Sequence, residues 1–156
     1  MKIFLDTADT EIISKHNETG LIDGITTNPT LIMKSGRDPE DVYQEIKDMG
    51  IRDISMEVVG SADEMTEEGI RLFEKFGFCS TIKVPMTRDG LLACSKLTDK
   101  GIRVNVTLIF SAAQAILATR AGAYYVSPFV GRLDDQSAAG LEVVRSISEL
   151  LSLIHI

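Results

Sequence analysis

The 156-residue sequence has few of the side chains on which metal sites and disulfide-bonded proteins depend. Its two histidines, His16 and His155, lie far apart, and no spacing typical of a metal site occurs. Its two cysteines, Cys79 and Cys94, occur without a secretory context, which predicts structural, reduced thiols in a cytoplasmic protein. We therefore expect no metal, no other cofactor and no disulfide.

Positive charge and long apolar runs are scarce as well. The chain carries 16 Lys and Arg residues against 23 Asp and Glu residues, and its basic residues are scattered. Because nucleic-acid binding requires a basic patch or stripe, we expect no nucleic-acid partner. The apolar runs fall short of the roughly 20 residues of a membrane span, so we expect no membrane partner. The N-terminal MKIFLDTADT lacks the apolar core of a secretory signal, and we expect a cytoplasmic protein.

Six short β-rich runs alternate with helical segments along the chain. Among the helical signals, Asp38 and Pro39 form an N-cap and first-turn pair, and Ser61 with Glu64 forms a capping box before a helix that stops at Gly77. The last segment repeats apolar residues at helical spacing, at Leu141, Val144, Ile147 and Leu150. The β-rich runs are residues 2–6, 24–28, 53–60, 80–85, 102–110 and 124–131.

This alternation predicts a parallel sheet with helical crossovers, either an open doubly wound sheet or a closed barrel. No glycine-rich phosphate loop follows the first run, which is evidence against a dinucleotide-binding sheet. Within each run, apolar residues of one parity are expected to face the helices, as for Val104, Val106 and Leu108. Polar residues of the other parity gather towards the carboxyl ends of the runs: Asp6, Asn28, Glu57, Lys83, Asn105, Thr107 and Ser127.

The shared parity of these polar residues favours the barrel. Barrel enzymes place their chemistry at the carboxyl ends of the strands, whereas an open sheet would give these residues no common cavity. We therefore predict an α/β fold of the (β/α)8 TIM-barrel type with an active site at its mouth.

Lys83 stands in the middle of an apolar run, STIKVPMT. Burying an ammonium group is costly unless it is paired or neutralised. One interpretation is a structural ion-pair network with Asp6 and Glu57 at the mouth of the barrel. The other is a Schiff-base nucleophile, because burial favours the neutral amine that attacks a carbonyl, and the two carboxylates would give and take protons. The spacing of the residues leaves both interpretations open.

A set of motifs resembles the transaldolase family, most closely its short bacterial-type branch, which also contains the fructose-6-phosphate aldolases. The motifs occur in order over about residues 1–150, and they are FLDTAD, GITTNPTL, EV, IKVPMT, VNVTLIFS and YVSPFVGR. The resemblance implies a class I aldolase mechanism in a (β/α)8 barrel, acting on sugar phosphates without a cofactor.

The same resemblance implies roles for individual residues. Lys83 matches the family's Schiff-base lysine, and Asp6 matches the aspartate that handles protons at the sugar hydroxyls. Glu57 matches the glutamate that activates the catalytic water, and Thr107 matches the threonine that holds this water. The other matches are to substrate-binding residues: Asn28, Asn105 and Ser127 for the dihydroxyacetone unit, and Arg132 for a phosphate.

Two positions separate the transferases of this family from the aldolases. The aldolases tend to carry glutamine where this chain has Glu57, and tyrosine where it has Phe129. A phenylalanine cannot help to protonate the enamine, so the dihydroxyacetone unit survives until an acceptor arrives. The resemblance therefore implies a pentose-phosphate-pathway transaldolase, with fructose 6-phosphate or sedoheptulose 7-phosphate as donor and erythrose 4-phosphate or glyceraldehyde 3-phosphate as acceptor. A fructose-6-phosphate aldolase is the alternative enzyme.

Each single residue also has a plainer interpretation. Asp6 is consistent with a turn residue, Asn28 with the start of a helix, and Thr107 with simple β-propensity. Arg132 is consistent with a surface residue beside two aspartates. Tyr43 and the methionines are interpreted as packing residues.

The chain ends earlier than the roughly 200–250 residues that such barrels typically need. We expect residues 1–150 to form a partial barrel of about six β/α units and residues 151–156, LSLIHI, to be a non-native tail that resembles a translated transposon-end adapter. Unpaired edge strands then predict a homo-oligomer that completes the barrel. Turnover is expected to be weak or lost, and the alternative to an enzyme is a catalytically inactive, self-associating fragment.

Overall fold

The computed structural model describes residues 2–135 and 140–154. Its strands form one sheet in the order β1-β2-β3-β4-β5-β6, and the registers of β1 with β2, β2 with β3 and β5 with β6 are parallel. A doubly wound sheet reverses its strand order part-way, whereas a barrel keeps chain order, so the observed order confirms the α/β fold of (β/α)8 type. The strands are β1 (Phe4–Asp6), β2 (Gly24–Thr26), β3 (Ile54–Glu57), β4 (Ser80–Pro85), β5 (Val104–Ile109) and β6 (Tyr125–Pro128).

The helices follow the strands as the sequence predicts, with three additions. The expected helices are α1 (Thr10–Asn17), α3 (Pro39–Asp48), α4 (Ala62–Phe76), α5 (Arg88–Thr98), α6 (Ala112–Arg120) and α8 (Gly140–Ile154). The additions are α2 (Pro29–Ser35), the 3-10 helix η1 (Gly77–Cys79) and α7 (Val130–Asp135). None of the helices within the described residues has the length and hydropathy that crossing a lipid bilayer requires.

The predicted helix caps are confirmed. The Asp38 carboxylate accepts a hydrogen bond from Glu40 N at 2.8 Å and begins α3. At the start of α4, the Glu64 carboxylate accepts from Ser61 N at 2.8 Å, and Ser61 Oγ accepts from Glu64 N at 3.4 Å. Gly77, at φ 72°, ends the same helix in the left-handed conformation that glycine adopts most readily. These local signals fix the helix boundaries before any packing is considered.

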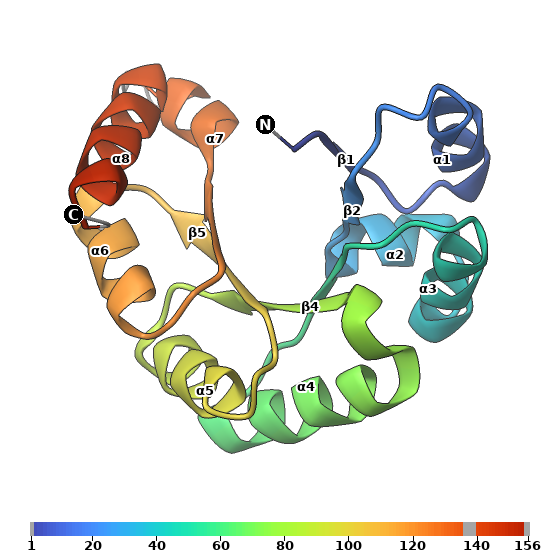
Figure 1. Ribbon diagram of the computed structural model, residues 1–156, viewed down its shortest axis with the longest axis horizontal. Helices are drawn as coiled ribbons and strands as arrows, with labels where there is room; N and C mark the ends of the chain where they lie inside the picture. The colour runs from blue at the N-terminus through green and yellow to red at the C-terminus, as the bar shows by residue number, and fades with distance from the viewer. Residues whose placement is uncertain (1, 136–139, 155–156) are drawn as a thin grey trace. The chain divides into compact units, whose positions relative to one another are not determined.

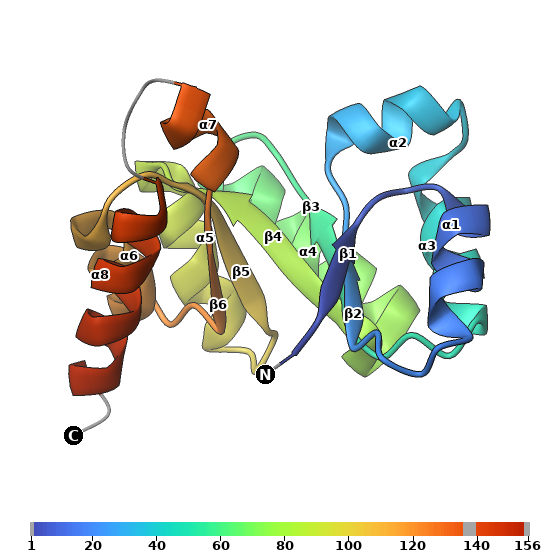
Figure 2. The same ribbon diagram turned by 90° about the horizontal axis from the view of Figure 1, so that it is seen from above.

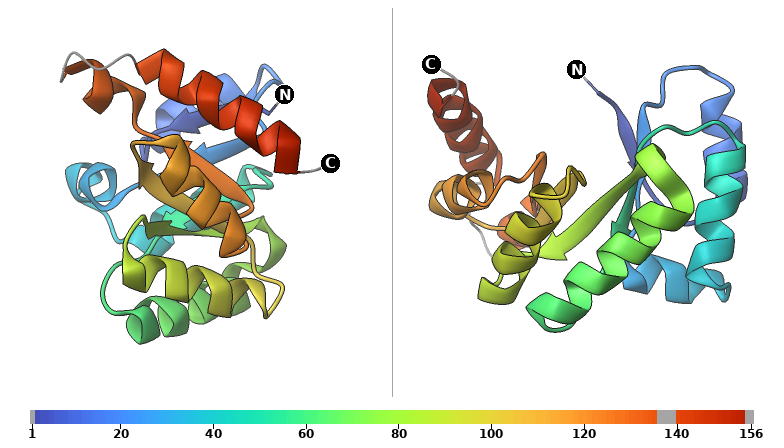
Figure 3. Two further views of the ribbon diagram at one scale, coloured as in Figure 1. Left: turned by 90° about the vertical axis from the view of Figure 1, so that its left-hand side faces the viewer. Right: turned by 60° about the horizontal axis from the view of Figure 1, so that its bottom comes forward.

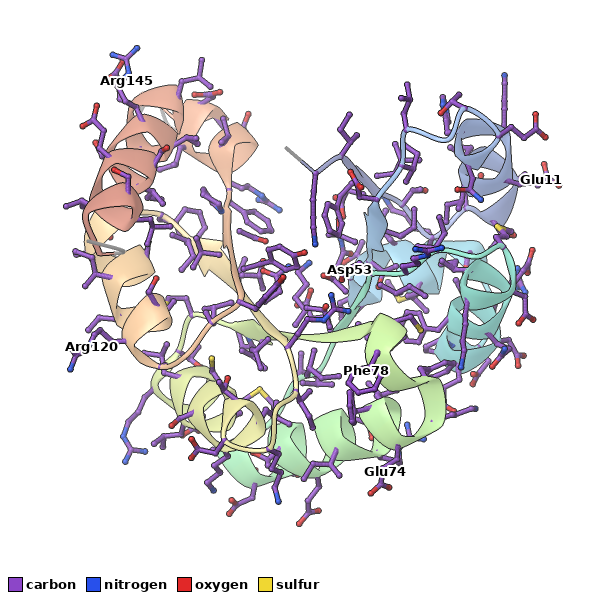
Figure 4. The ribbon with its side chains drawn as sticks, viewed as in Figure 1. Glu11, Asp53, Glu74, Phe78, Arg120 and Arg145 are labelled. Carbon is purple, nitrogen blue, oxygen red and sulfur yellow. The ribbon has the colours of Figure 1, made fainter. Side chains whose placement is uncertain are left out.

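The chain divides into two compact units, which are described separately. The first comprises the residues up to Val58 together with Glu68–Ile82. In it α1 lies beside α3, next to the sheet strands β1 and β2 (Figure 1). The first unit also buries Asp53, which directly precedes β3 and is labelled in Figure 4. Its carboxylate accepts a hydrogen bond from Thr81 Oγ1 at 2.7 Å. Its fully buried side chains include Ile13, Ile25, Ile46, Ile54, Met56 and Phe76.

The second unit comprises Val59–Glu67 and the chain from Lys83 onward. Its strands β5 and β6 lie beside α6, and α8 packs against α6 and α7 (Figures 2 and 3). Of the apolar repeat on α8, Ile147 is buried, but Leu141 is 74% exposed and Val144 is 37% exposed. The helix continues to Ile154, so it includes part of the proposed tail, and residues 155–156 of that tail lie outside the described residues.

The predicted alternation of faces holds for the inner strands and fails at one residue. Met56, Ile82, Val84 and Val106 are fully buried, as expected of residues that face the helices. Leu108 was assigned to the same face, and that assignment is wrong, because Leu108 is 38% exposed and its neighbour Ile109 is fully buried. The cause is a register shift between Thr107 and Ile109 in the pairing of β5 with β6, at which Leu108 takes the left-handed φ of 61°.

Candidate active site

Lys83 lies within β4, a strand of which five of the six residues are buried. Its strand neighbours Ile82 and Val84 are fully buried, and Lys83 itself is only 4% exposed. Lysine is almost never buried to this extent without a specific environment for its amine. The structure therefore confirms that this amine is taken out of bulk water.

Three more of the expected site residues lie on β5 and β6 in the same unit as Lys83. Thr107 is paired in register with Ser127, and in a parallel ladder such partners point to the same face of the sheet. Ser127 Oγ donates a hydrogen bond to Asn105 Oδ1 at 2.8 Å, which shows that Asn105 shares this face. The bond also fixes the orientation of the Asn105 amide.

The hydroxyl of Thr107 is the unusual group in this cluster. Thr107 is 1% exposed, and its Oγ1 is a buried polar atom with no hydrogen-bond partner among the described residues. A buried hydroxyl without a partner costs about 1–3 kcal/mol. Such a group in a native fold calls for a partner that joins later, such as a water or a ligand.

Phe129 and Arg132 follow β6 towards and within α7. Phe129 is half-buried, and its ring packs against that of Phe110 with the centroids 6.0 Å apart. Phe129 N donates to the carbonyl of Ile109 at 3.0 Å, which attaches the residue to the end of β5. Arg132 is exposed on α7, so its guanidinium is open to solvent and able to meet an anionic ligand.

In the first unit, Asp6 ends β1 and is exposed. It pairs in register with Thr26 of β2, and Thr26 Oγ1 donates a hydrogen bond to Asp6 Oδ1 at 2.8 Å. Thr26 holds the carboxylate in one orientation and leaves its second oxygen to other partners. Thr26 was not among the predicted site residues, and the signal that identifies it is the register in which β1 pairs with β2.

Asn28 takes the plainer role that the sequence left open for it, as the N-cap of α2. Its Oδ1 accepts a hydrogen bond from Leu31 N at 2.9 Å, and Pro29 occupies the first helical position. The cap uses the acceptor of the amide, so the side-chain nitrogen of the half-buried Asn28 is still available to donate to a substrate. Capping and substrate binding are therefore compatible.

Glu57 ends β3 and borders a cavity of about 480 Å³ within the first unit. The buried Tyr43 lines the same cavity, and its hydroxyl lies 3.4 Å from Thr27 Oγ1. Burial raises the pKa of Tyr43, and the negative charge of Glu57 adds to this rise. Tyr43 packs edge-on against the Phe76 ring, with centroids 6.0 Å apart, so it is a packing residue that also borders the space beside Glu57.

Neither Cys79 nor Cys94 forms a disulfide bond. Cys94 is buried on α5, and burial raises the pKa of its thiol to about 11, which keeps it protonated and unreactive at neutral pH. In the part of the chain that the structure describes, no group of His, Cys, Asp and Glu side chains is arranged to hold a metal ion.

Comparison with known proteins decides the family. A family model described as Transaldolase/Fructose-6-phosphate aldolase matches residues 3–155. The chain belongs to this family. The resemblance found in the sequence motifs is thereby confirmed, and the chain is a member of a family of enzymes.

Curated relatives in the family are closely similar along most of the chain. A probable transaldolase of Paracoccus denitrificans is 52% identical over 151 residues, which cover 96% of this chain and 69% of that protein. A probable transaldolase of Nitrosopumilus maritimus is 50% identical and is covered to 68%, and probable transaldolase 1 of Listeria monocytogenes is 50% identical and is covered to 73%. The chain thus spans about seven tenths of the length of these relatives.

Solved structures with a similar fold are distant in sequence. The carboxyl transferase domain of pyruvate carboxylase from Rhizobium etli has a TM-score of 0.56 at 14% identity, covering 81% of this chain and 26% of that one. A mandelate oxidase has a TM-score of 0.53 at 13% identity, covering 81% of this chain and 48% of that one. At these identities the likeness concerns the fold alone.

Proposed function

We propose that this member of the family is a transaldolase that moves a dihydroxyacetone unit from a ketose phosphate to an aldose phosphate through a Schiff base on Lys83. The observation that carries the proposal is the burial of this lysine, 4% exposed, at the position of the family's motif IKVPMT. The amine of a lysine is the nucleophile in Schiff-base chemistry, and a buried site shields it from bulk water.

The reaction begins with attack of the Lys83 amine on the C2 carbonyl of the ketose. The resulting carbinolamine loses water and leaves an iminium ion between the lysine nitrogen and C2. This water needs a binding group, and the unpartnered buried hydroxyl of Thr107 is suited to hold it. The Glu57 carboxylate, at the end of β3, gives and takes the proton of the same water.

Carbon–carbon cleavage follows, with Asp6 as the base. Its carboxylate removes the proton of the C4 hydroxyl, the C3–C4 bond breaks, and the electron pair passes into the iminium to form an enamine. The aldose phosphate leaves, and the enamine carbon attacks the carbonyl of the acceptor while Asp6 returns the proton. The hydrogen bond from Thr26 fixes the carboxylate for both transfers.

Substrate binding is assigned to the amides, the serine and the arginine. Asn28, Asn105 and Ser127 bind the hydroxyls of the dihydroxyacetone unit, and the bond between Ser127 and Asn105 orders two of these groups before the substrate arrives. Arg132 offers the planar donors of its guanidinium to a phosphate.

Transfer, rather than release of free dihydroxyacetone, is supported by two residues. Glu57 and Phe129 stand where the aldolases of the family tend to have glutamine and tyrosine. Phe129 packs on Phe110 and offers no hydroxyl to protonate the enamine, so the intermediate persists until an aldose phosphate accepts it. The same assignment places the reaction in the pentose phosphate pathway and in the cytoplasm.

Borohydride trapping tests the proposal directly. Incubation of the 156-residue chain with fructose 6-phosphate and borohydride is expected to leave a reduced sugar adduct on Lys83, of six carbons before cleavage or of three carbons after it, identified by peptide mass spectrometry. Lys83→Arg, which keeps the charge but removes the nucleophile, is the matched control and should carry no adduct. Absence of the adduct from the unchanged chain would sink the proposal and favour an inactive, self-associating fragment. Product analysis with and without glyceraldehyde 3-phosphate distinguishes transfer from aldolase cleavage, because only an aldolase releases dihydroxyacetone without an acceptor.

A further inference from the structure

The bulge at Leu108 interrupts β5 at the residue that follows Thr107. Thr107 pairs with Ser127 and Ile109 with Pro128, so β5 has one residue more than β6 across this step. Leu108 is that additional residue, and it takes φ 61°. Apart from the glycines, it is the one residue with a positive φ among those the structure describes. Residues with a side chain rarely adopt this conformation, so it needs an explanation.

Packing of the leucine side chain does not supply that explanation. Leu108 is 38% exposed, whereas the residues on both sides of it are buried, Thr107 at 1% and Ile109 at 0%. The side chain at the unfavourable backbone position thus gains less from burial than either of its neighbours. The neighbouring contacts must be what maintains the bulge.

Those contacts fix the backbone on each side of Leu108. The carbonyl of Thr107 accepts a hydrogen bond from Met86 N at 2.9 Å, just past the end of β4. The carbonyl of Ile109 accepts from Phe129 N at 3.0 Å, just past the end of β6. In a regular strand Thr107 and Ile109, two positions apart, would point to the same face of the sheet. The additional left-handed residue between them breaks this alternation, and both side chains are buried.

We propose that Leu108 is a positioning residue for the reaction, whose left-handed bulge sets the buried hydroxyl of Thr107 in its reactive orientation. The inference rests on the proposed function, since it is the Schiff-base chemistry that uses this hydroxyl. The two anchors hold the backbone on either side of the bulge, and the bulge in turn sets where the buried Oγ1 of Thr107, which has no partner among the described residues, points. The property that matters at position 108 is therefore its backbone conformation rather than its side chain.

Two pairs of variants separate backbone from side chain. Leu108→Gly and Leu108→Asn remove the leucine but tolerate the left-handed conformation. Leu108→Val and Leu108→Ile keep an apolar side chain, but β-branching makes this conformation a genuine outlier. For each variant, the rate of borohydride trapping on Lys83 is measured against fructose 6-phosphate concentration, and folding is monitored by circular dichroism and thermal melting.

The glycine and asparagine variants are expected to have rates of borohydride trapping on Lys83 within about threefold of the rate of the unchanged chain. The valine and isoleucine variants should trap about tenfold more slowly or worse at saturating sugar, with the half-saturating concentration altered less than about threefold, because orientation and not binding is lost. Equal rates in all four, or slow trapping in a folded Leu108→Gly protein, would overturn the inference. If the β-branched variants do not fold, the glycine and asparagine variants decide the question. A trapping rate close to that of the unchanged chain supports the inference, and a lost or slow reaction overturns it. A failure of the unchanged chain to trap would instead refute the proposed function.

Discussion

The buried hydroxyl of Thr107 shows how a single residue can oppose stability and serve function. It has no hydrogen-bond partner among the described residues, although it is as inaccessible as the apolar core around it. The neighbouring Asn105 and Ser127 satisfy one another and do not compensate for it. An apolar group of similar shape would suit the folded chain better than the hydroxyl does.

Replacing Thr107 with valine is therefore expected to leave the chain as stable as before or to stabilise it by about 1–2 kcal/mol, while trapping on Lys83 slows about tenfold or more. Denaturant unfolding and the trapping rate measure the two effects. Thr107→Ser, which keeps a hydroxyl, is the control and should retain most of the rate. A Thr107→Val protein that is clearly less stable would mean that the hydroxyl has a structural partner after all.

Between elements, the helices α3 and α4 of the first unit are joined by an ion-pair network. Glu40 of α3 accepts from Arg71 of α4 at 2.5 Å and also pairs with Lys75, and Arg71 pairs with Glu68 on its own helix at 2.7 Å. Hydrogen bonds from Arg71 and then Lys75 lower the pKa of Glu40 below its ordinary value of 4.5. The network thus links two helices that are separated by β3 in the chain.

A carboxyl group whose pKa is lower in the folded state than in the unfolded state stabilises the fold at pH values above its ordinary pKa. This stabilisation is lost as the pH falls through the pKa of the folded state. The Glu40→Gln variant is accordingly expected to be less stable than the unchanged chain by about 0.5–1 kcal/mol at neutral pH. The difference should shrink as the pH falls below 4.5. Urea unfolding at a series of pH values measures it.

Glu74→Gln provides the matched control for this experiment. Glu74 is exposed on α4 (Figure 4), and its replacement by glutamine removes the same charge from the first unit without breaking the network. Its stability difference should be near zero at every pH. If the difference in free energy of unfolding between Glu40→Gln and the unchanged chain does not depend on pH, the ion pairs of Glu40 contribute nothing to stability.

At the scale of the whole molecule, β1 and β6 are the terminal strands of the sheet, and within the described residues each is hydrogen-bonded to one neighbouring strand. Unpaired strand edges and exposed apolar side chains favour association with another chain. In the second unit, Leu141 and Val144 of α8 are exposed on the same helix that buries Ile147. These features support the proposal that the 156-residue chain forms a homo-oligomer.

We expect light scattering coupled to size-exclusion chromatography to give a mass above that of one chain. The double variant Leu141→Asp, Val144→Asp should shift the chain towards monomer, because it places two charges on the exposed apolar face of α8. Arg145→Asp is the control, because it lies on the same helix and changes the net charge by the same two units (Figure 4). It should not shift the chain towards monomer. A folded monomer from the unchanged chain would contradict the proposal.

The sequence predicts the parts of the fold that local rules control. Alternating polarity locates all six strands, and the capping signals at Asp38 and Ser61 locate the starts of α3 and α4, because these features depend on residues a few positions apart. The helices α2 and α7 were not predicted as separate elements, since seven and six residues are too few to show a helical repeat.

Features that depend on pairing between strands were beyond sequence reasoning. The bulge at Leu108 arises from the register of β5 against β6, and the bond between Thr26 and Asp6 arises from the register of β1 against β2. No pattern within one strand carries this information. The sequence therefore identified Lys83, Asn105 and Thr107 as buried polar residues but not the contacts that orient their neighbours.

The chain-order pairing of the strands also bears on how the protein is made. Phe4 pairs with Gly24, Ile25 with Ile54, and Asn105 with Tyr125, so each of these partners lies only a few dozen residues further along. A domain dominated by such short-range pairings closes small loops and folds quickly for its class. On the ribosome, each new strand finds its neighbour already synthesised, and the sheet can grow one β/α unit at a time as the chain emerges.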